Sequence, residues 1–187
     1  MRATRDYQMT AEEYLRVEEA AGERSELVDG YLRAMSGGSR AHNRVPVVLT
    51  RLLFDAARAS GCEVFGSDMK VRVSERTFYY PDLTVTCEPG SDDAHYLDHP
   101  CTVFEVLSPS TERTDRGEKF ENYLRLPSLR AYLLVNPEKR RVDMYVREGQ
   151  GWNLTVLEGE GEFRLPCPAV AIDLADLFIG VPEDAAS

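Results

Sequence analysis

The sequence has few cysteines, and no two of them have the close spacing of a metal motif. Its 187 residues include four, Cys62, Cys87, Cys101 and Cys167, and none lies in a CxxC pair. Paired spacing of that kind marks most zinc sites. Three of the four lie beside or within apolar, strand-like runs, as buried cysteines commonly do. We therefore expect buried, reduced thiols, as in cytosolic proteins, and no zinc site.

Long apolar runs are also lacking. No segment approaches the roughly 20 apolar residues that a membrane span needs. The N-terminal stretch MRATRDYQMT lacks the apolar core of a signal peptide. We therefore expect no membrane contact and a cytoplasmic location. The length, with 43% hydrophobic and 29% charged residues, suits one globular domain. We predict a domain over residues 7–181, with tails at residues 1–6 and 182–187.

Basic residues are in deficit. Lysine and arginine number 22 against 32 aspartates and glutamates, which gives a formal net charge of −10. A protein that follows the phosphates of a nucleic acid usually carries a basic patch, because counterion release drives its binding. The charge balance therefore disfavours tight, non-specific DNA binding. The acidic net charge is still compatible with an enzyme whose charges segregate, or are offset by a metal.

Local signals predict a helix and a hairpin at the start of the chain. Thr10 and Glu13 have the spacing of a capping box at the beginning of a helix over residues 9–20. An Asp-Gly pair at positions 29–30 predicts the turn of a hairpin over residues 26–35.

A long amphipathic helix is expected over residues 40–59. Pro46 is tolerated only in the first turn of a helix, so this helix is expected to begin near Asn43. Strands follow, including one over residues 78–87. The nearly continuous apolar run at residues 101–108 is typical of a central strand buried on both faces.

The next helix is expected to begin with Asp115 and Glu118 in a second capping box. The strand–helix–strand unit over residues 102–135 should form a right-handed crossover. Helices before and within a set of strands predict an α/β (α+β) domain, in which helices flank a central mixed β-sheet.

Two carboxylates are candidates for a metal site. Glu105 is a charge within the central apolar strand, so it needs a cation, a hydrogen-bond partner or a raised pKa. Asp82 follows Pro81 at the start of another strand-like run. The alternatives are an arginine partner for Glu105 and an ordinary strand-entry role for Asp82. Together the two suit Mg²⁺, which binds a few carboxylate oxygens and assists phosphoester hydrolysis.

A lysine near these acids would orient water and balance charge on a phosphate. Lys119 lies one turn into the helix that follows the Glu105 strand, and Lys70 lies on the polar face of the strand before Asp82. A solvated surface position is the alternative for either one. For Lys119, a simple ion pair with Asp115 at i, i+4 is a further alternative.

Glu26 and His42 are weaker candidates. Glu26, at the start of the predicted hairpin, is a possible third carboxylate for the metal, although such a glutamate is often solvated. His42 follows a glycine-containing loop at a helix start, where it would reach a phosphate or water. A histidine exposed at the helix end is the alternative.

These segments resemble those of a known family. The ordered series ELVDG, Ser39 to His42, YPDLTV, VFEVLSPST, DRGEKFENY and LRAYLLVNP is similar to that of the Uma-two family of restriction endonucleases, part of the PD-(D/E)XK nuclease superfamily. The resemblance covers nearly the whole chain. It implies a restriction-endonuclease-like fold and a phosphodiesterase site that uses Mg²⁺ (or Mn²⁺).

The resemblance also implies roles for single residues. Asp82 matches the aspartate of the PD motif, and Glu105 matches the first residue of the (D/E)XK motif. The chain departs from the motif at Leu107, where the motif has lysine, and leucine neither orients water nor balances charge. Lys119 matches the lysine of the following helix, with Lys70 as the alternative.

Two further matches complete the set implied by the resemblance. Glu26 matches the family's N-terminal acid, and His42 matches its helix-start histidine. The resulting hypothesis is a Mg²⁺-dependent endonuclease that hydrolyses phosphodiester bonds of nucleic acid, expected to be DNA.

The alternative hypothesis is a catalytically inactive binding or scaffold protein with the nuclease fold, which the acidic balance and Leu107 favour.

A homodimer would suit cleavage of both strands of a duplex. Its contact would use the strand edges near residues 26–35 or 142–157.

Overall fold

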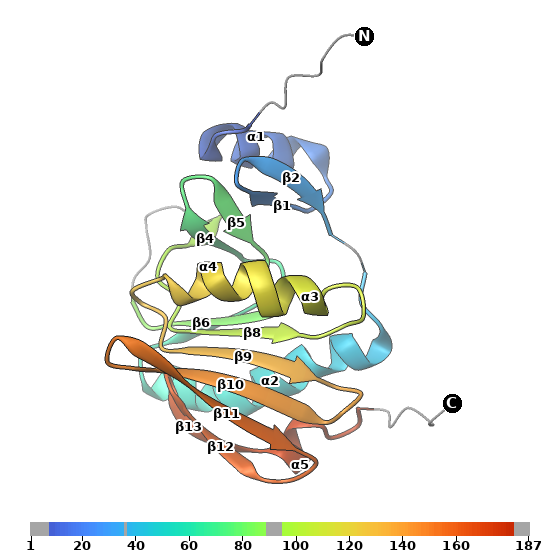
Figure 1. Cartoon of the computed structure of the whole chain (residues 1–187), viewed down its shortest axis with the longest axis vertical. Coiled ribbons are helices and arrows are strands. Elements are labelled where there is room, and N and C mark those ends of the chain that lie inside the picture. The colour runs from blue at the N-terminus through green and yellow to red at the C-terminus, as the bar shows by residue number, and fades with distance from the viewer. Residues whose placement is uncertain (1–7, 36, 89–94, 182–187) are drawn as a thin grey trace.

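The computed structural model describes residues 8–35, 37–88 and 95–181, and it has an α+β architecture. The predicted tails at residues 1–6 and 182–187 lie outside these ranges. Figure 1 shows a large sheet in the lower half of the molecule and a smaller sheet above it. Within the described ranges, no helix combines the length and apolarity that a membrane crossing requires.

The large sheet has six strands and mixed directions, as the sequence predicts. Strands β8 and β9 are parallel, and the other neighbours are antiparallel. In spatial order the strands are β11 (Gly151–Glu158), β10 (Arg141–Glu148), β9 (Ala131–Asn136), β8 (Thr102–Val106), β6 (Leu83–Thr86) and β3 (Glu63–Gly66).

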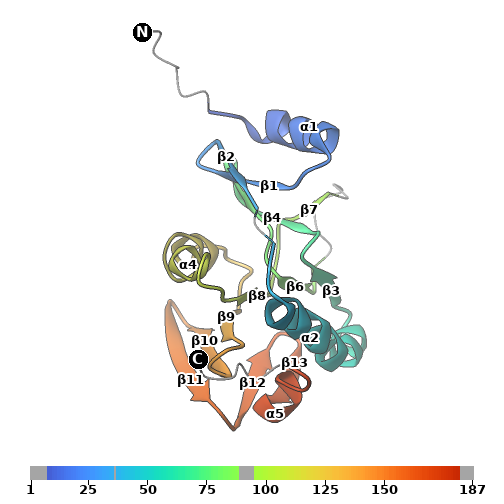
Figure 2. The ribbon, with the colours of Figure 1, turned by 90° about the vertical axis from the view of Figure 1, so that its right-hand side faces the viewer.

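Helices cover both faces of this sheet (Figure 2). Helix α2 (Arg40–Ala59) packs on one face, together with Phe104 and Val106 of β8. The other face is covered by a helical segment made of α3 (Glu112–Thr114), a π-helical turn η1 (Asp115–Lys119) and α4 (Phe120–Leu124). Val103 and Leu107 pack on that second side. Because side chains alternate along a strand, Glu105 faces the η1 side.

The small sheet holds the N-terminal hairpin. Its order is β2 (Tyr31–Ala34), β1 (Ser25–Val28), β5 (Thr77–Tyr79), β4 (Lys70–Ser74) and β7 (Tyr96–Leu97). Helix α1 (Ala11–Ala21) closes it through a small core of Tyr14, Leu27 and Phe78. The capping box of Thr10 and Glu13 and the turn at positions 29–30 are both confirmed.

The C-terminal region contains a hairpin that the sequence analysis did not predict. Strands β12 (Glu162–Pro166) and β13 (Ala169–Asp173) pair antiparallel and lead into α5 (Leu174–Leu177). Their core-facing residues, Phe163, Leu165 and Ile172, join the core beneath α2.

The predicted strand over residues 78–87 was wrong as a single element. Its first part is β5 in the small sheet and its second part is β6 in the large sheet. Pro81 cannot donate a ladder hydrogen bond, and the chain leaves one sheet and enters the other around Pro81-Asp82. The change of sheet puts Asp82 at the junction between them.

Two helix starts also differ from prediction. Helix α2 begins at Arg40, not near Asn43, because the Ser39 side chain accepts a hydrogen bond from the backbone N–H of His42 and caps the first turn. The later helix begins at Glu112, and Asp115 does not cap it. Asp115 instead is buried inside the π-helical turn.

The expectation of reduced thiols is contradicted. Disulfides join Cys62 to Cys87 and Cys101 to Cys167. The partners are 25 and 66 residues apart in sequence, so only the tertiary fold brings them together.

A buried aspartate paired with two arginines holds the η1 turn against the large sheet. Asp143 of β10 is 2% exposed and accepts hydrogen bonds from Arg116 (2.6 Å) and Arg141 (2.7 Å). Burial raises the pKa of Asp143, but the two guanidinium hydrogen bonds outweigh it and hold that pKa below its usual range.

We expect Asp143→Asn to lower the free energy of unfolding by about 1.5–3 kcal/mol at pH 7, the range for hydrogen bonds to charged groups. Because the folded-state pKa is depressed, this stability is present above the unfolded pKa of about 4. It is lost as the pH falls through the folded value. Urea unfolding across that pH range should therefore show the two proteins converging in acid. Asp55→Asn, at an exposed position of α2, is the control, and an equal loss in both variants would contradict the prediction.

Candidate active site

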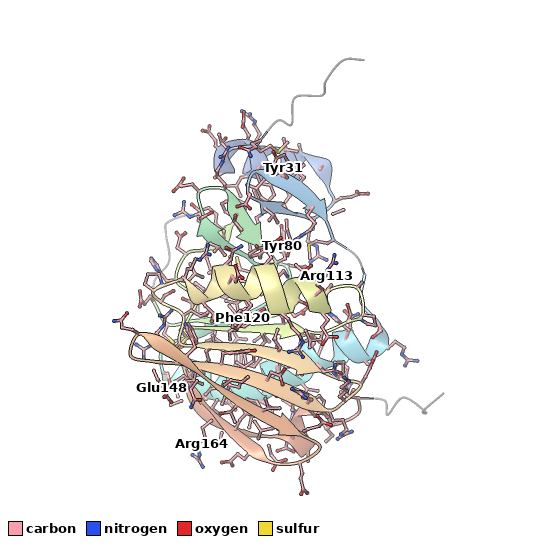
Figure 3. The ribbon with its side chains drawn as sticks, viewed as in Figure 1. Tyr31, Tyr80, Arg113, Phe120, Glu148 and Arg164 are labelled. Carbon is pink, nitrogen blue, oxygen red and sulfur yellow. A yellow bond between two sulfur atoms is a disulfide. The ribbon has the colours of Figure 1, made fainter. Side chains whose placement is uncertain are left out.

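One cavity opens where the small sheet, the large sheet and the η1 turn meet. Its volume is about 200 Å³. Figure 3 labels Tyr80, one of its lining residues, between the small sheet and the α3–α4 segment. Five of the six predicted site residues line it, namely Glu26, His42, Asp82, Glu105 and Lys119.

Strand register places Asp82 beside Glu105. Strands β6 and β8 are antiparallel, with Leu83 opposite Phe104, so the next position outward brings Asp82 opposite Glu105. The Asp82 carboxylate accepts a hydrogen bond of 2.6 Å from the backbone N–H of Val106. Asp82 thus continues the strand pairing with its side chain where the β6 backbone turns away. Burial raises its pKa, against the opposing effect of His42 and of this hydrogen bond.

Glu105 is 2% exposed and is paired with a lysine, not with an arginine. Its Oε1 lies 3.0 Å from Nζ of Lys119. Burial raises the pKa of Glu105 well above its usual range; Lys119 opposes the shift, while Asp115 and Asp82 add to it. A carboxyl in this setting binds a proton or a cation more readily than one in water does.

Lys119 lies at the centre of the acidic residues. Its Nζ is 3.1 Å from Glu26 Oε1 and 3.6 Å from Asp115 Oδ1, in addition to its contact with Glu105. Burial alone would lower the pKa of Lys119, but the attraction of Glu105, Glu26 and Asp115 outweighs it and raises that pKa above its ordinary value. The ammonium group therefore stays charged at neutral pH.

Glu26 connects the hairpin to the site. It is 6% exposed, and its Oε1 also accepts a hydrogen bond from the backbone N–H of Tyr80 (3.2 Å). Its Oε2 accepts from Arg33, its cross-strand partner on β2, at 2.8 and 3.1 Å. Arg33 also donates to Glu118 of η1. Arg33 is not among the site residues predicted from the sequence; its hairpin register opposite Glu26 is the signal that points to it.

His42 reaches the cavity from the first turn of α2. Its Nε2 is 3.6 Å from Asp82 Oδ2, and its side chain is 17% exposed. It is neither fully buried nor a freely solvated helix-end residue.

Lys70 lies outside this cavity. It pairs with Glu18 of α1 at 2.5 Å and lies 5.5 Å from the centre of the Tyr80 ring. Lys70 lies on β4 of the small sheet, whereas Glu105 lies on β8 of the large sheet. Lys70 therefore pairs with a residue of α1 and not with Glu105. Of the two lysine candidates, the structure brings Lys119 to Asp82 and Glu105.

Asp115 is a fourth carboxylate of the cavity that the sequence analysis treated only as a helix cap or an ion-pair partner. It is 2% exposed, and burial raises its pKa against the attraction of Lys119. Among the described residues, its Oδ1 is a buried oxygen without a hydrogen-bond partner. The i, i+4 spacing to Lys119 is the signal that could have found it.

The donor set fits a divalent cation. Four carboxylates line the cavity, from Glu26, Asp82, Glu105 and Asp115, and two cations face them, Lys119 and the shared Arg33. When all the acids are ionised, the excess negative charge is at least that of one divalent ion. Hard oxygen donors are those that Mg²⁺ and Mn²⁺ prefer. Asp115 Oδ1 accepts no hydrogen bond from the described residues, and its contact with Lys119 Nζ is 3.6 Å long.

Comparison with known proteins identifies the family of the chain. The Uma2 (Uma-two) family, described as "Putative restriction endonuclease", matches residues 11–178. The chain belongs to this family. Two uncharacterized proteins of Synechocystis sp. are also similar, slr1290 and sll1609. The first is 36% identical over 169 residues, covering 89% of this chain and 88% of the relative. The second is 38% identical over 157 residues, covering 81% and 89%.

A solved structure shares the fold. It is described as a putative nuclease belonging to DUF820 from Anabaena variabilis, and it matches with a TM-score of 0.76 at 16% identity. The match covers 93% of this chain and 99% of that one. The restriction-endonuclease-like fold predicted from the Uma2 resemblance is thus confirmed.

We expect Lys119→Met to lower the free energy of unfolding by about 3–5 kcal/mol in metal-free buffer, since it leaves buried carboxylates without their cation. Adding Glu105→Gln to the variant should recover part of the loss, because it removes one of those charges. Urea denaturation with a chelator present measures both. Lys139→Met, at an exposed position, is the matched control. Equal, small effects at positions 119 and 139 would show that the cluster does not depend on Lys119.

Proposed function

We propose that the chain is a Mg²⁺-dependent (or Mn²⁺-dependent) endonuclease that hydrolyses phosphodiester bonds in DNA. The observation that carries the proposal is the meeting of Asp82 and Glu105, from antiparallel strands, beside the ammonium group of Lys119. The Uma2 family and the nuclease fold support nuclease activity at the level of class.

Asp82 and Glu105 would hold the metal, with Asp115 and Glu26 as the further oxygen donors of the cavity. A bound divalent cation supplies positive charge that polarises a phosphate and activates water. The raised pKa values of Asp82, Glu105 and Asp115 have burial as their largest cause. A cation in their midst would take the place of the protons that these carboxyls otherwise bind.

Lys119 acts by charge and hydrogen bonding, not as a base. Because its pKa is raised, it has no free lone pair at neutral pH. It can donate to the attacking water and to the phosphate oxygens, whose negative charge grows in the transition state. His42, 3.6 Å from Asp82, would contact the phosphate or the water from the α2 side.

The acidic net charge is consistent with this mechanism. At a net charge of −10, counterion release over a broad basic face is a weak source of affinity. The cation bound at the cavity, with Lys119 and Arg33, would supply the local positive charge. Cleavage is therefore expected to depend on the metal for binding of DNA as well as for chemistry.

Titration calorimetry with Mn²⁺ tests the metal site. We expect the wild type to bind, and Asp82→Ala to lose affinity by more than about 100-fold, since changes even to outer-shell partners cost 10- to 100-fold. Plasmid cleavage with Mg²⁺ should fall by a similar factor in Glu105→Gln and Lys119→Met. Lys70→Met and the exposed-site variant Asp55→Ala should still cleave.

Two outcomes would change the assignment. Equal Mn²⁺ affinity in wild type and Asp82→Ala would remove Asp82 from the metal site, and cleavage that survives Glu105→Gln would identify a contaminating nuclease. A wild type that binds Mn²⁺ but cleaves neither DNA nor RNA would support an inactive binding protein with this fold.

We also propose that the chain forms a homodimer in the cytoplasm through β11. This strand is an edge of the large sheet, and β10 is its partner among the described residues. Leu154 and Val156 on it are 47% and 46% exposed. Antiparallel pairing of two β11 edges would join two sheets by a two-fold axis, and two sites would suit the two strands of a duplex.

Sedimentation velocity tests the dimer. The wild type should sediment as a dimer, and a Leu154→Lys/Val156→Lys variant should sediment as a monomer with an unchanged circular dichroism spectrum, because charge on an edge strand opposes pairing. The exposed hydrophobic residue Phe54 of α2 provides a control, Phe54→Lys, that should remain dimeric. A monomeric wild type would rule out the proposal.

A further inference from the structure

The four cysteines gather at one end of the large sheet. Cys62 precedes β3, Cys87 follows β6 and Cys101 precedes β8. In the β3–β6 register, Glu63 lies opposite Thr86, so the next position outward brings Cys62 opposite Cys87. Cys101 enters the adjacent strand, where its backbone N–H donates to Val85 O.

Cys167 reaches the same place from the β12–β13 turn. Its backbone carbonyl accepts a hydrogen bond from the Thr102 hydroxyl, which fixes the turn against β8. The two disulfides touch each other there: Cys87 Sγ is 3.1 Å from Cys167 Sγ and 3.5 Å from Cys101 Sγ. The Cys87 sulfur is therefore in contact with the sulfurs of the other three cysteines.

We propose that, in the reduced protein, the four cysteine thiolates bind one Zn²⁺ ion. A tetrahedral zinc site with Zn–S bonds of about 2.3 Å separates its sulfurs by about 3.8 Å. The contacts between the disulfides, at 3.1 and 3.5 Å, are already near that spacing. One ligand atom from each of Cys62, Cys87 and Cys167 lies within 4.8 Å of the others.

The surroundings suit a structural site. Cys62, Cys101 and Cys167 are 8%, 6% and 6% exposed, and a cavity of about 390 Å³ lined by all four cysteines gives an ion a way in. Arg130 also lines that cavity. A zinc ion with four thiolates carries a net charge of −2, and a nearby guanidinium favours such a charge.

The absence of a CxxC pair does not exclude this site. Zinc motifs read from sequence supply two ligands from one tight turn, whereas here four separate strand ends or turns supply one each. The sheet and the β12–β13 hairpin, not local spacing, bring the ligands together. The expectation of no zinc site in the sequence analysis followed from spacing alone.

Two disulfides or one zinc ion would be alternative ways to cross-link the four cysteines at this end of the large sheet. A dithiol reductant gives each disulfide two electrons and two protons, which yields two cysteine thiols and the oxidised, cyclic disulfide of the reductant. Binding of Zn²⁺ to four thiols then releases four protons. Disulfides rarely persist in a reducing cytoplasm, so the zinc form would belong to the proposed location. The inference does not depend on nuclease activity.

The experiment uses the full chain, reduced with a phosphine under argon, with its four thiols counted by Ellman's reagent. Titration with Co²⁺ reports directly on thiolate ligands, through intense ultraviolet charge-transfer bands and visible bands of tetrahedral geometry. We expect one such ion per chain, displaced by one Zn²⁺ that resists a competing chelator. The reduced protein should also unfold at a higher temperature with Zn²⁺ than without it.

Variants separate this site from the carboxylate cavity. Cys101→Ser should weaken Zn²⁺ binding by more than about 100-fold. Asp82→Ala should leave the thiolate bands unchanged, because Asp82 lies before β6 and Cys87 lies after it. His99→Ala, which alters another residue of the cysteine-lined cavity, should also retain them.

The wild type alone can overturn the proposal, so a variant that fails to fold does not block the test. A protein with four titrated thiols that shows no thiolate–Co²⁺ bands would refute it. Bands of full intensity in Cys101→Ser would refute it equally. The disulfide-bonded protein should show no such bands, and their presence there would mean that other ligands produce them.

Discussion

The buried ammonium group of Lys119 is the interaction on which the candidate site depends. It contacts carboxylates from three separate parts of the chain, Glu26 of the hairpin, Glu105 of the central strand and Asp115 of its own helix. Without it, burial of these acids would be prohibitively unfavourable. These three contacts join the small sheet, the large sheet and the η1 turn. The lysine that neutralises the acids therefore also holds the walls of the cavity together.

Alternation along β8 explains how a lysine from the helix reaches a carboxylate of the strand. Leu107, two positions after Glu105 and just past the end of β8, packs on the same side under the helical segment. The side chain of Lys119 extends from η1 toward this face of the sheet, and its ammonium group donates a hydrogen bond to Glu105. The π-helical turn buries both Asp115 and Lys119, and π-helical turns are frequent at functional sites. Stabilisation of a phosphate requires a positive charge at one position in space, and a lysine on the strand or on the helical turn can supply it.

Sequence reasoning found the residues whose signals are local. The capping box of Thr10, the turn at positions 29–30 and the acid within an apolar strand each depend on a few neighbours. It did not find what depends on pairing at a distance. The division of residues 78–87 between two sheets, the place of Lys70 beside Glu18 and the inward turn of Asp115 all follow from which strands become neighbours. Hydrophobic alternation specifies the faces of a strand but not its partners.

The two ends of β6 and β8 depend on each other. Asp82 and Glu105 meet at one end, and Cys87 and Cys101 meet the other cysteines at the opposite end. A slip of one residue in this pairing would turn every side chain of a strand to the other face. Glu105 would then point at the apolar core under α2, away from Lys119. A covalent or metal closure at the cysteine end opposes such a slip, and so it helps to hold the carboxylates at the distant end in place.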